Sequence, residues 1–380
     1  MKILNAIHAQ GIGGVDQVFR NYSEILLQKN HQVALLISDN GYDKYAAKKI
    51  FKLKNSSQIF DCIKLLWILL IFKPDVVLCH SRRLMKWMKI MRFFSKTKSV
   101  AINHGISFES SLNCDYVINI NQQISDLVVK TGFDKEKSFV LPNVIKVDQK
   151  YRAKTLKIAP TIGIYGRIEP RKGFDILIEA AGILLKNGHD FRLKIGGFEV
   201  AGGYTKATSK LNSLLWYIGV PRKAGRDSCR VKNKKYNEVQ RTSVYNLNTI
   251  KEFTRNNDVL EKCEFVGTVL DKSKFFENVD ILCVPSREEP FGLVILEGFL
   301  FSTLVISSNT DGGKLLIKND EDGLLFENEN AKDLAQKIIK VLSNPEIYAS
   351  FTNKAFSKLE KEFSFDFLAQ EIEKILTKIS

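Results

Sequence analysis

The sequence predicts an α/β protein built from two doubly wound parallel sheets. Short buried runs alternate with amphipathic helical stretches along the chain, which is typical of parallel strands covered by helices on both faces. The alternation stops at a polar, aperiodic stretch, residues 146–157, and then restarts. With 380 residues, the chain is long enough for two domains. We expect domains at 1–148 and 149–362, and a C-terminal helix at 363–380 that packs back toward the first domain.

Each expected strand is a short apolar, β-branched run bounded by turn residues. In the first half these runs are 2–8, 32–38, 75–80, 99–103, 116–119 and 139–141. In the second half they are 161–165, 191–195, 263–266, 281–284 and 304–307. Apolar residues recurring at helical spacing predict helices at 15–28, 174–185 and 291–301. More than sixty residues separate the strands at 191–195 and 263–266, so we expect a basic insertion near 202–244.

Composition narrows the class of protein further. The net charge of +15 is concentrated in two segments: residues 82–98 carry seven basic and no acidic side chains, and residues 204–255 carry twelve basic and three acidic ones. Six cysteines without a CxxC pair argue against a disulfide scaffold or a zinc cluster, and favour a reducing compartment. The most apolar run, 63–72, is too short to span a bilayer. No recognised nucleic-acid motif accompanies the charge.

The strongest motif follows the predicted strand at 281–284 and opens a helix. A strand-to-helix turn in an open α/β sheet lies at the carboxyl edge, where ligands bind. The first-turn amides near Phe291, Gly292 and Leu293 suit a diphosphate. Glu289 precedes the helix and Glu297 lies about two turns along it, so both carboxylates can accept hydrogen bonds from sugar hydroxyls. The alternative is that Glu297 faces solvent.

A second motif, Gly-Arg-Ile-Glu-Pro-Arg-Lys-Gly at 166–173, also lies between a strand and a helix. Arg167 and Lys172 can converge on a diphosphate leaving group, Arg with a planar fork and Lys as a point charge. A basic loop alone is a weak signal. In the same half as the first motif, it indicates a site for a phosphorylated ligand.

Together these motifs resemble the retaining GT-B glycosyltransferases, and most closely glycosyltransferase family 4. The stretches that carry the resemblance, in chain order, are Gly13-Gly14, His104-Gly105, 141–144, 166–173, 280–286, 289–298 and 322–326. They cover nearly the whole chain. The resemblance implies a GT-B fold, with two Rossmann-like domains that face each other across a cleft.

The resemblance also implies roles for individual residues. Arg167 and Lys172 would neutralise the departing diphosphate in place of a metal, Glu289 would hold the donor sugar, and His104 would approach that sugar from the N-terminal domain. Glu297 would bind the ribose. The other expected donor-binding residues are Phe291, Gly292, Leu293, Gly13 and Gly14, the last two from the family's N-terminal acceptor-side loop.

Three positions depart from the family pattern. Pro290 and Leu316 stand where the family usually has Gly and Glu, and the residues after Glu297 are not the usual run of small side chains. Residues 320–322 imitate the DxD metal motif of the other glycosyltransferase fold, but they lie in a turn and we expect no metal site.

Residues 82–98 predict an amphipathic helix with a basic face. Leu84, Trp87, Met88, Met91, Phe94 and Ile90 fall on one arc, and Arg82, Lys86, Lys89, Arg92 and Lys96 gather opposite. Such a helix can lie on an anionic membrane, with Arg82, Lys86, Lys89, Arg92 and Trp87 as candidate contacts. Alternatively, its apolar face packs on the sheet and its charges are merely solvated.

The resemblance therefore implies a metal-independent glycosyltransferase. It would move a sugar from a UDP- or GDP-linked donor to a glycan or lipid-linked acceptor, with retention, in bacterial surface polysaccharide or lipopolysaccharide biosynthesis. We expect no cofactor and no nucleic-acid partner, and a cytoplasmic protein peripheral on the inner face of the cell membrane. A GT-B epimerase or phosphorylase, and an inactive anion- or lipid-binding protein, stay open as alternatives.

Overall fold

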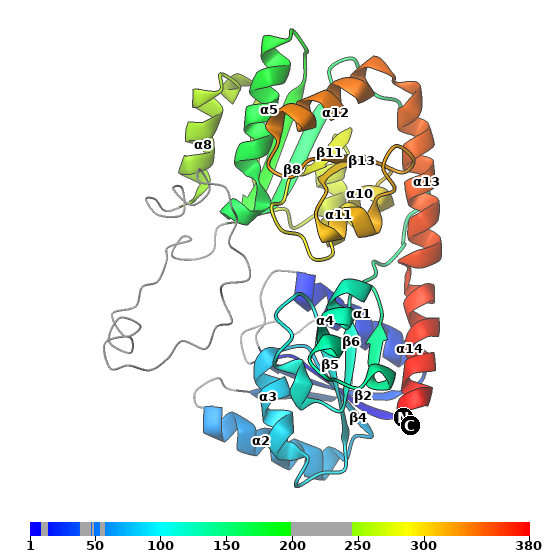
Figure 1. Ribbon diagram of the computed structural model, residues 1–380. Coiled ribbons are helices and arrows are strands. Elements are labelled where there is room, and N and C mark those ends of the chain that lie inside the picture. Colours follow the sequence, from blue (N-terminus) through cyan, green and yellow to red (C-terminus); the bar gives the residue numbers. More distant parts are fainter. Residues whose placement is uncertain (9–13, 39–46, 48, 54–57, 199–244) are drawn as a thin grey trace, which may run out of the picture. The chain divides into compact units, whose positions relative to one another are not determined.

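The computed structural model describes residues 1–8, 14–38, 47, 49–53, 58–198 and 245–380. The chain forms two compact units (Figure 1). The first unit comprises Met1–Asp148 and Lys358–Ser380, and the second comprises Gln149–Ser357. Each unit is built on its own sheet, so the predicted fold class of two doubly wound parallel sheets is confirmed. The expected insertion at 202–244 lies outside the described residues.

The first unit contains a seven-stranded sheet in the order β3-β2-β1-β4-β5-β6-β7. All of its strand pairs are parallel. The strands are β1 (Lys2–Ala6), β2 (Gln32–Ser38), β3 (Lys49–Leu53), β4 (Val76–Cys79), β5 (Lys98–Asn103), β6 (Tyr116–Asn119) and β7 (Ser138–Val140). The order reverses direction between β1 and β4, the point where doubly wound sheets bind ligands.

Helices cover both faces of this sheet. They are α1 (Gly14–Gln28), α2 (Gln58–Phe72), α3 (Arg82–Met91), α4 (Gln122–Lys130) and α14 (Phe365–Ile379). α2 and α3 share one core with Leu4 of β1. Asn5, which points to the other face because strand side chains alternate, donates to Phe19 O and Ser23 Oγ of α1. α14 packs against α1.

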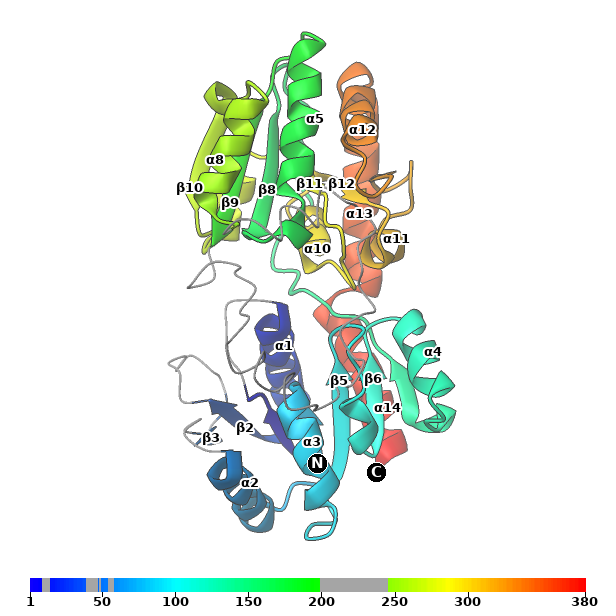
Figure 2. The same ribbon diagram turned by 60° about the vertical axis from the view of Figure 1, so that its left-hand side comes forward.

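The second unit contains a six-stranded parallel sheet in the order β10-β9-β8-β11-β12-β13. The strands are β8 (Thr161–Arg167), β9 (Arg192–Phe198), β10 (Cys263–Gly267), β11 (Ile281–Val284), β12 (Leu304–Ser308) and β13 (Leu324–Phe326). Its helices are α5 (Phe174–Lys186), α8 (Leu247–Asn256), α9 (Lys272–Phe276), α10 (Leu293–Leu300), α11 (Asp311–Leu316), α12 (Ala331–Ser343) and most of α13 (Glu346–Glu362). Figure 2 shows α5, α8 and α12 beside this sheet.

Most predicted elements are found within two or three residues of their expected ends. Two strands were not predicted, β3 and β13, and both lie at a sheet edge. The predicted helix at 291–301 begins only at Leu293, because Phe291 and Gly292 still belong to the preceding turn.

The C-terminal segment is fastened to the first unit by polar contacts as well as by its apolar face. Lys98 Nζ donates to the backbone oxygens of Ile379 and Ser380, and His31 Nε2 lies 2.6 Å from Glu373 Oε1. Ile145 N–H donates to Phe363 O over 2.9 Å. The unit therefore starts and finishes with segments that are distant in sequence.

Candidate active site

The candidate site lies at the carboxyl ends of β8 and β11, which are neighbours in the second sheet. The loop after β8 contains a 3-10 turn, η3 (Pro170–Lys172), and Gly173 starts α5 with a φ of 68°. A Cβ at this glycine would lie 2.0 Å from Pro285 O, in the loop after β11. Only glycine therefore allows the two loops to approach this closely.

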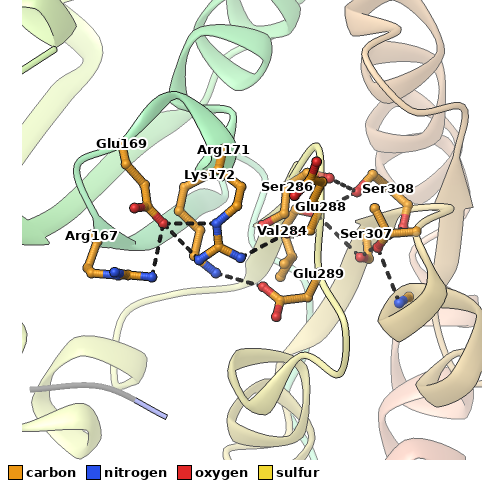
Figure 3. Close-up of polar contacts among 12 residues, drawn as sticks. Arg167, Glu169, Arg171, Lys172, Val284, Ser286, Glu288, Glu289, Ser307 and Ser308 are labelled. Carbon is orange, nitrogen blue, oxygen red and sulfur yellow. Dashed lines mark hydrogen bonds and ion pairs between the residues drawn. The ribbon is translucent and has the colours of Figure 1, made fainter. Parts of the chain in front are cut away.

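Three cations lie here: Arg167 ends β8, and Arg171 and Lys172 belong to the loop that follows. We call them the cation cluster (Figure 3). The buried Glu169 carboxylate lies 2.8 Å from Arg171 Nη2 and 3.2 Å from Arg167 Nη2. Charge-assisted bonds of this kind fix the direction of a guanidinium. Arg167 keeps 42% of its side chain exposed, so it stays accessible to an anion.

Lys172 joins the first loop to Glu289 of the second. Its Nζ lies 2.6 Å from Glu289 Oε2, and both side chains are largely buried (Figure 3). Burial alone would raise the pKa of Glu289, but the positive charges of Lys172, Arg171 and Arg167 outweigh it and hold that pKa below its ordinary value. Glu289 is therefore an ionised acceptor beside three cations, of which Arg167 and Lys172 were candidate site residues in the sequence analysis.

The backbone around Glu289 is also held in place. Arg171 Nη1 donates to Glu288 O over 3.2 Å, and Gly312 N–H donates to Glu289 O over 2.7 Å. A Cβ on Gly312 would lie 2.3 Å from Phe291 O, so a side chain there would displace this loop. Contacts from the loop after β8 and from α11 thus hold the backbone that carries the Glu289 carboxylate.

The start of α10 differs in part from expectation. Gly292 takes a φ of 101° and Leu293 begins the helix, and the Ile295 amide donates to Gly292 O over 2.8 Å. Contact of the Gly292 and Leu293 amides with a ligand stays a prediction. Phe291, however, is only 3% exposed and belongs to the core, so its ring is not a ligand contact. Leu316 is fully buried, which gives this departure from the family pattern a packing role.

Glu297 does not face solvent; it is 5% exposed. Burial raises its pKa to about 8. The side chain of Lys272, from α9, is in direct contact with the Glu297 carboxylate. The ammonium favours the ionised carboxylate and so opposes the effect of burial. Lys272 was not singled out from sequence, since it lies 25 positions away on a separate helix.

His104 lies in the first unit, after β5, beside a second histidine. Its Nε2 is 3.2 Å from Nδ1 of His80, which follows β4, and the two rings are stacked. Burial lowers the pKa of His104 to about 4, and burial together with the neighbouring His104 lowers the pKa of His80 well below its ordinary value. Both rings are therefore neutral near pH 7. His80 ends the run predicted as a strand at 75–80 and was not singled out from sequence.

The third histidine at this edge follows β1. His8 Nε2 lies 3.0 Å from Arg83 Nη1 and 3.6 Å from Asp61 Oδ2, and the ring is 4% exposed. It ties α2 and α3 to the end of β1. Gly14 is the exposed first residue of α1, whereas Gly13 lies outside the described residues.

The predicted membrane contact Trp87 requires a correction. The apolar face of α3 is packed in the core: Trp87 is 8% exposed and touches His8 edge-on. Its ring cannot enter a bilayer. Ile90, expected on the same arc, is instead 50% exposed. The basic residues Arg82, Lys86, Lys89 and Arg92 are exposed, as the helical spacing predicts.

The DxD-like turn has structural partners. Asp322 Oδ1 accepts from Lys318 N–H over 2.7 Å, and Asp320 pairs with Lys340. Throughout the described part of the chain, no three His, Cys, Asp or Glu side chains are grouped as metal ligands. In the same residues, no helix is both long and apolar enough to cross a membrane.

Comparison with known proteins indicates the class of protein that has this fold. Residues 243–358 match the family model of the glycosyl transferases group 1. Solved structures with the same two-unit architecture include a glycosyltransferase from Rickettsia africae (19% identity, TM-score 0.76, covering 100% of this chain and 98% of that one) and HepE from Anabaena in complex with UDP and glucose (16% identity, TM-score 0.74, 99% of both). The chain thus has the GT-B fold, and the matched domain supports a glycosyltransferase.

Among curated proteins, the chain is 25% identical over 128 residues to an uncharacterised glycosyltransferase of Haemophilus influenzae, covering 33% of this chain and 36% of that protein. It is 22% identical over 292 residues to the capsular polysaccharide glycosyltransferase CapM of Staphylococcus aureus, covering 75% of this chain and 63% of that protein. It is also 22% identical over 296 residues to the lipopolysaccharide core glycosyltransferase LpsE of Rhizobium meliloti, covering 77% and 72%. The matches to the first two therefore span less than two thirds of those relatives.

Proposed function

We propose that the protein transfers a sugar from a nucleotide-diphosphate sugar to a hydroxyl group of a glycan or lipid-linked acceptor. One observation carries the proposal: the cation cluster and the ionised Glu289 lie together at the carboxyl edge of the second sheet, next to the start of α10. This edge offers cations for a diphosphate and an acceptor for sugar hydroxyls. The group 1 match covers the Glu289 side of it.

The chemistry explains why cations belong there. Glycosyl transfer develops positive charge on the sugar and negative charge on the departing phosphate. Arg167 and Lys172 would stabilise that negative charge more in the transition state than in the ground state, which is what accelerates a reaction. Because the charge is met by side chains, we propose a reaction that needs no metal.

The other residues would position the donor. Glu289 would accept hydrogen bonds from the sugar hydroxyls, the Gly292 and Leu293 amides would meet phosphate or sugar, and Glu297 would accept from the ribose. Ribose binding by Glu297 competes with Lys272, which occupies the same carboxylate. The proposal includes His104, held by His80, as a neutral hydrogen-bonding partner for the sugar.

We extend the proposal to retention of anomeric configuration, to a UDP- or GDP-linked donor and to bacterial surface polysaccharide or lipopolysaccharide synthesis at the inner face of the cell membrane. The printed roles of CapM and LpsE support the pathway class. HepE, a structure with UDP and glucose bound, supports the class of donor.

A panel of nucleotide sugars tests the reaction. A true donor binds only the folded protein, so it should raise the thermal midpoint, and release of its nucleotide should follow when acceptor is added. Lys172→Met should lower the turnover of that donor by about 100- to 1000-fold, the usual effect of removing a transition-state donor.

Lys318→Met is the matched control, because Lys318 lies in the same unit with 68% of its side chain exposed and pairs only with nearby acids. If no nucleotide sugar shifts the midpoint, the protein is not this transferase. If Lys172→Met and Lys318→Met turn over equally fast, the cation cluster is not the site.

A further inference from the structure

α2 is apolar on its outward side as well as on its inward side. Leu65, Ile68, Leu69 and Phe72 are buried in the core shared with α3. Six other large apolar residues of the same helix are between 51% and 72% exposed: Ile59, Phe60, Ile63, Trp67, Leu70 and Ile71. Their spacing of roughly four residues places them along one side, and we call this row the α2 stripe. Contiguous exposed apolar surface of this kind marks an interaction site.

Apolar residues at the end of α3 adjoin the α2 stripe. Ile90, Phe93 and Phe94 are 50%, 79% and 58% exposed. Leu70 and Phe94 line the same cavity, of about 600 Å³, so the end of α2 and the turn after α3 are neighbours. Both views show α2 at the periphery of its unit, near α3 (Figures 1 and 2).

The surroundings of the stripe are strongly positive. Residues 58–98 contain nine basic and two acidic side chains. Both acids are engaged, Asp61 with His8 in the interior and Asp75 with the Lys2 amide. The exposed cations are Lys73, Arg82, Arg83, Lys86, Lys89, Arg92 and Lys96. The patch therefore combines an apolar centre with a cationic rim.

This combination selects among possible occupants. A second copy of the chain would bring two cationic rims together, and like charges across an interface oppose association. An anionic bilayer meets both halves of the patch, since apolar side chains insert at the headgroup boundary while Lys and Arg contact phosphates. A tryptophan such as Trp67 suits that boundary because its ring is amphipathic.

We propose that the α2 stripe is the surface by which this protein docks on an anionic membrane, with α3 supplying the electrostatic attraction. α3 cannot insert its own apolar face, which is packed in the core. The inference concerns the first unit alone and holds whichever reaction the second unit supports.

Sedimentation with lipid vesicles tests the proposal. The full chain should bind vesicles of phosphatidylcholine and phosphatidylglycerol, with binding weakened by high salt and much weaker on phosphatidylcholine alone. Replacing Ile63 and Trp67 by serine should reduce the partition coefficient about tenfold or more, because it removes inserted apolar area. Ile63→Ser/Trp67→Ser should still fold, since both residues are exposed, and an unchanged thermal midpoint verifies this.

Leu270→Ser is the matched control: Leu270 is 78% exposed but lies in the second unit, and its loss should leave vesicle binding unchanged. Lys86→Gln/Lys89→Gln/Arg92→Gln should weaken binding at low salt and flatten its salt dependence. Absence of binding to anionic vesicles, or equal binding by Ile63→Ser/Trp67→Ser and the parent, would overturn the proposal. The proposal would also be overturned if the parent protein formed a dimer without vesicles and Ile63→Ser/Trp67→Ser made it a monomer. The α2 stripe would then be the interface with a second copy of the chain.

Discussion

Apart from the additional edge strand β7 of the first sheet, the two units have the same strand order, but they carry different side chains at the same edge. β1 and β4 are the central reversal point of the first sheet, as β8 and β11 are of the second. The ends of β8 and β11 and the loops after them carry Arg167, Lys172 and Glu289, whereas His8 and His80 follow β1 and β4. The topology places loops at the corresponding edge of both sheets, and the residues of those loops decide whether the edge presents cations or neutral hydrogen-bonding rings.

Removing the carboxylate at the charged edge should have the largest effect. Glu289→Gln keeps the shape but loses the charge that is paired with Lys172, and we expect donor turnover to fall by about 100- to 1000-fold. The measurement is nucleotide release under saturating donor. Glu288→Gln is the control, because Arg171 donates to the backbone oxygen of Glu288, which this substitution keeps. Equal losses in both variants would mean that Glu289 has no special role.

The next largest effect should come from the glycine that brings the charged loops together. Gly173→Ala places a Cβ against Pro285 O, and we expect a loss of about 2–4 kcal/mol in the free energy of unfolding. Gly188, in the same unit, has a φ of 77° but open space around it. Gly188→Ala should cost only about 1 kcal/mol, from backbone strain. Denaturant unfolding of both variants separates the contact with Pro285 O from the backbone strain. Equal losses in the free energy of unfolding would contradict the close approach of the two loops.

A smaller effect is expected at the histidine edge. His104→Ala removes a single neutral hydrogen-bonding group, so turnover should fall about tenfold, with little change in nucleotide affinity. Steady-state kinetics and nucleotide titration measure the two quantities separately. A loss as large as that of Glu289→Gln would mean that the two edges contribute equally to catalysis.

A pH dependence of stability is expected from the same pair of histidines. The pKa of His104 is lowered to about 4 and that of His80 also lies below its ordinary value, so the unfolded chain takes up more protons than the folded one as pH falls below about 6.5. Stability should therefore decrease between pH 6.5 and 4. Thermal midpoints across this window should fall less steeply for His80→Asn/His104→Asn than for the parent. An equally steep fall would assign the effect to other groups.

The fold and the cation-rich loop could be predicted from the sequence because each depends on short contiguous runs of residues. β11, for example, is an uninterrupted apolar tetrapeptide, and the loop after β8 lies within eight residues. β3 was missed because it is an edge strand with two lysines and only partial burial. The pair Lys172–Glu289 joins residues 117 positions apart, and the His80–His104 stack joins two strands. Such contacts depend on the order of the strands in the sheet, which cannot be predicted from a local sequence pattern.

α2 shows the same limit from another direction. A helix that is apolar all round reads as a buried helix, and nothing in its own fifteen residues tells which side is covered. Among the residues that the structure describes, the core covers only one side of α2. The Trp87 correction has the same origin. A helix that lies on a membrane and a helix that packs on a sheet have the same spacing of apolar residues.

The fastening of residues 358–380 to the first unit affects the order in which the protein can fold during synthesis. Ile372, Ile375 and Leu376 of α14 are buried, and the contacts to Lys98 and His31 join the two ends of the unit. When the ribosome has made residues 1–148, that sheet still lacks its closing helix. The second unit, Gln149–Ser357, is synthesised completely before the first unit receives its last segment, Lys358–Ser380. Nascent chains should therefore expose the docking site of α14 until residues 365–379 have left the ribosome.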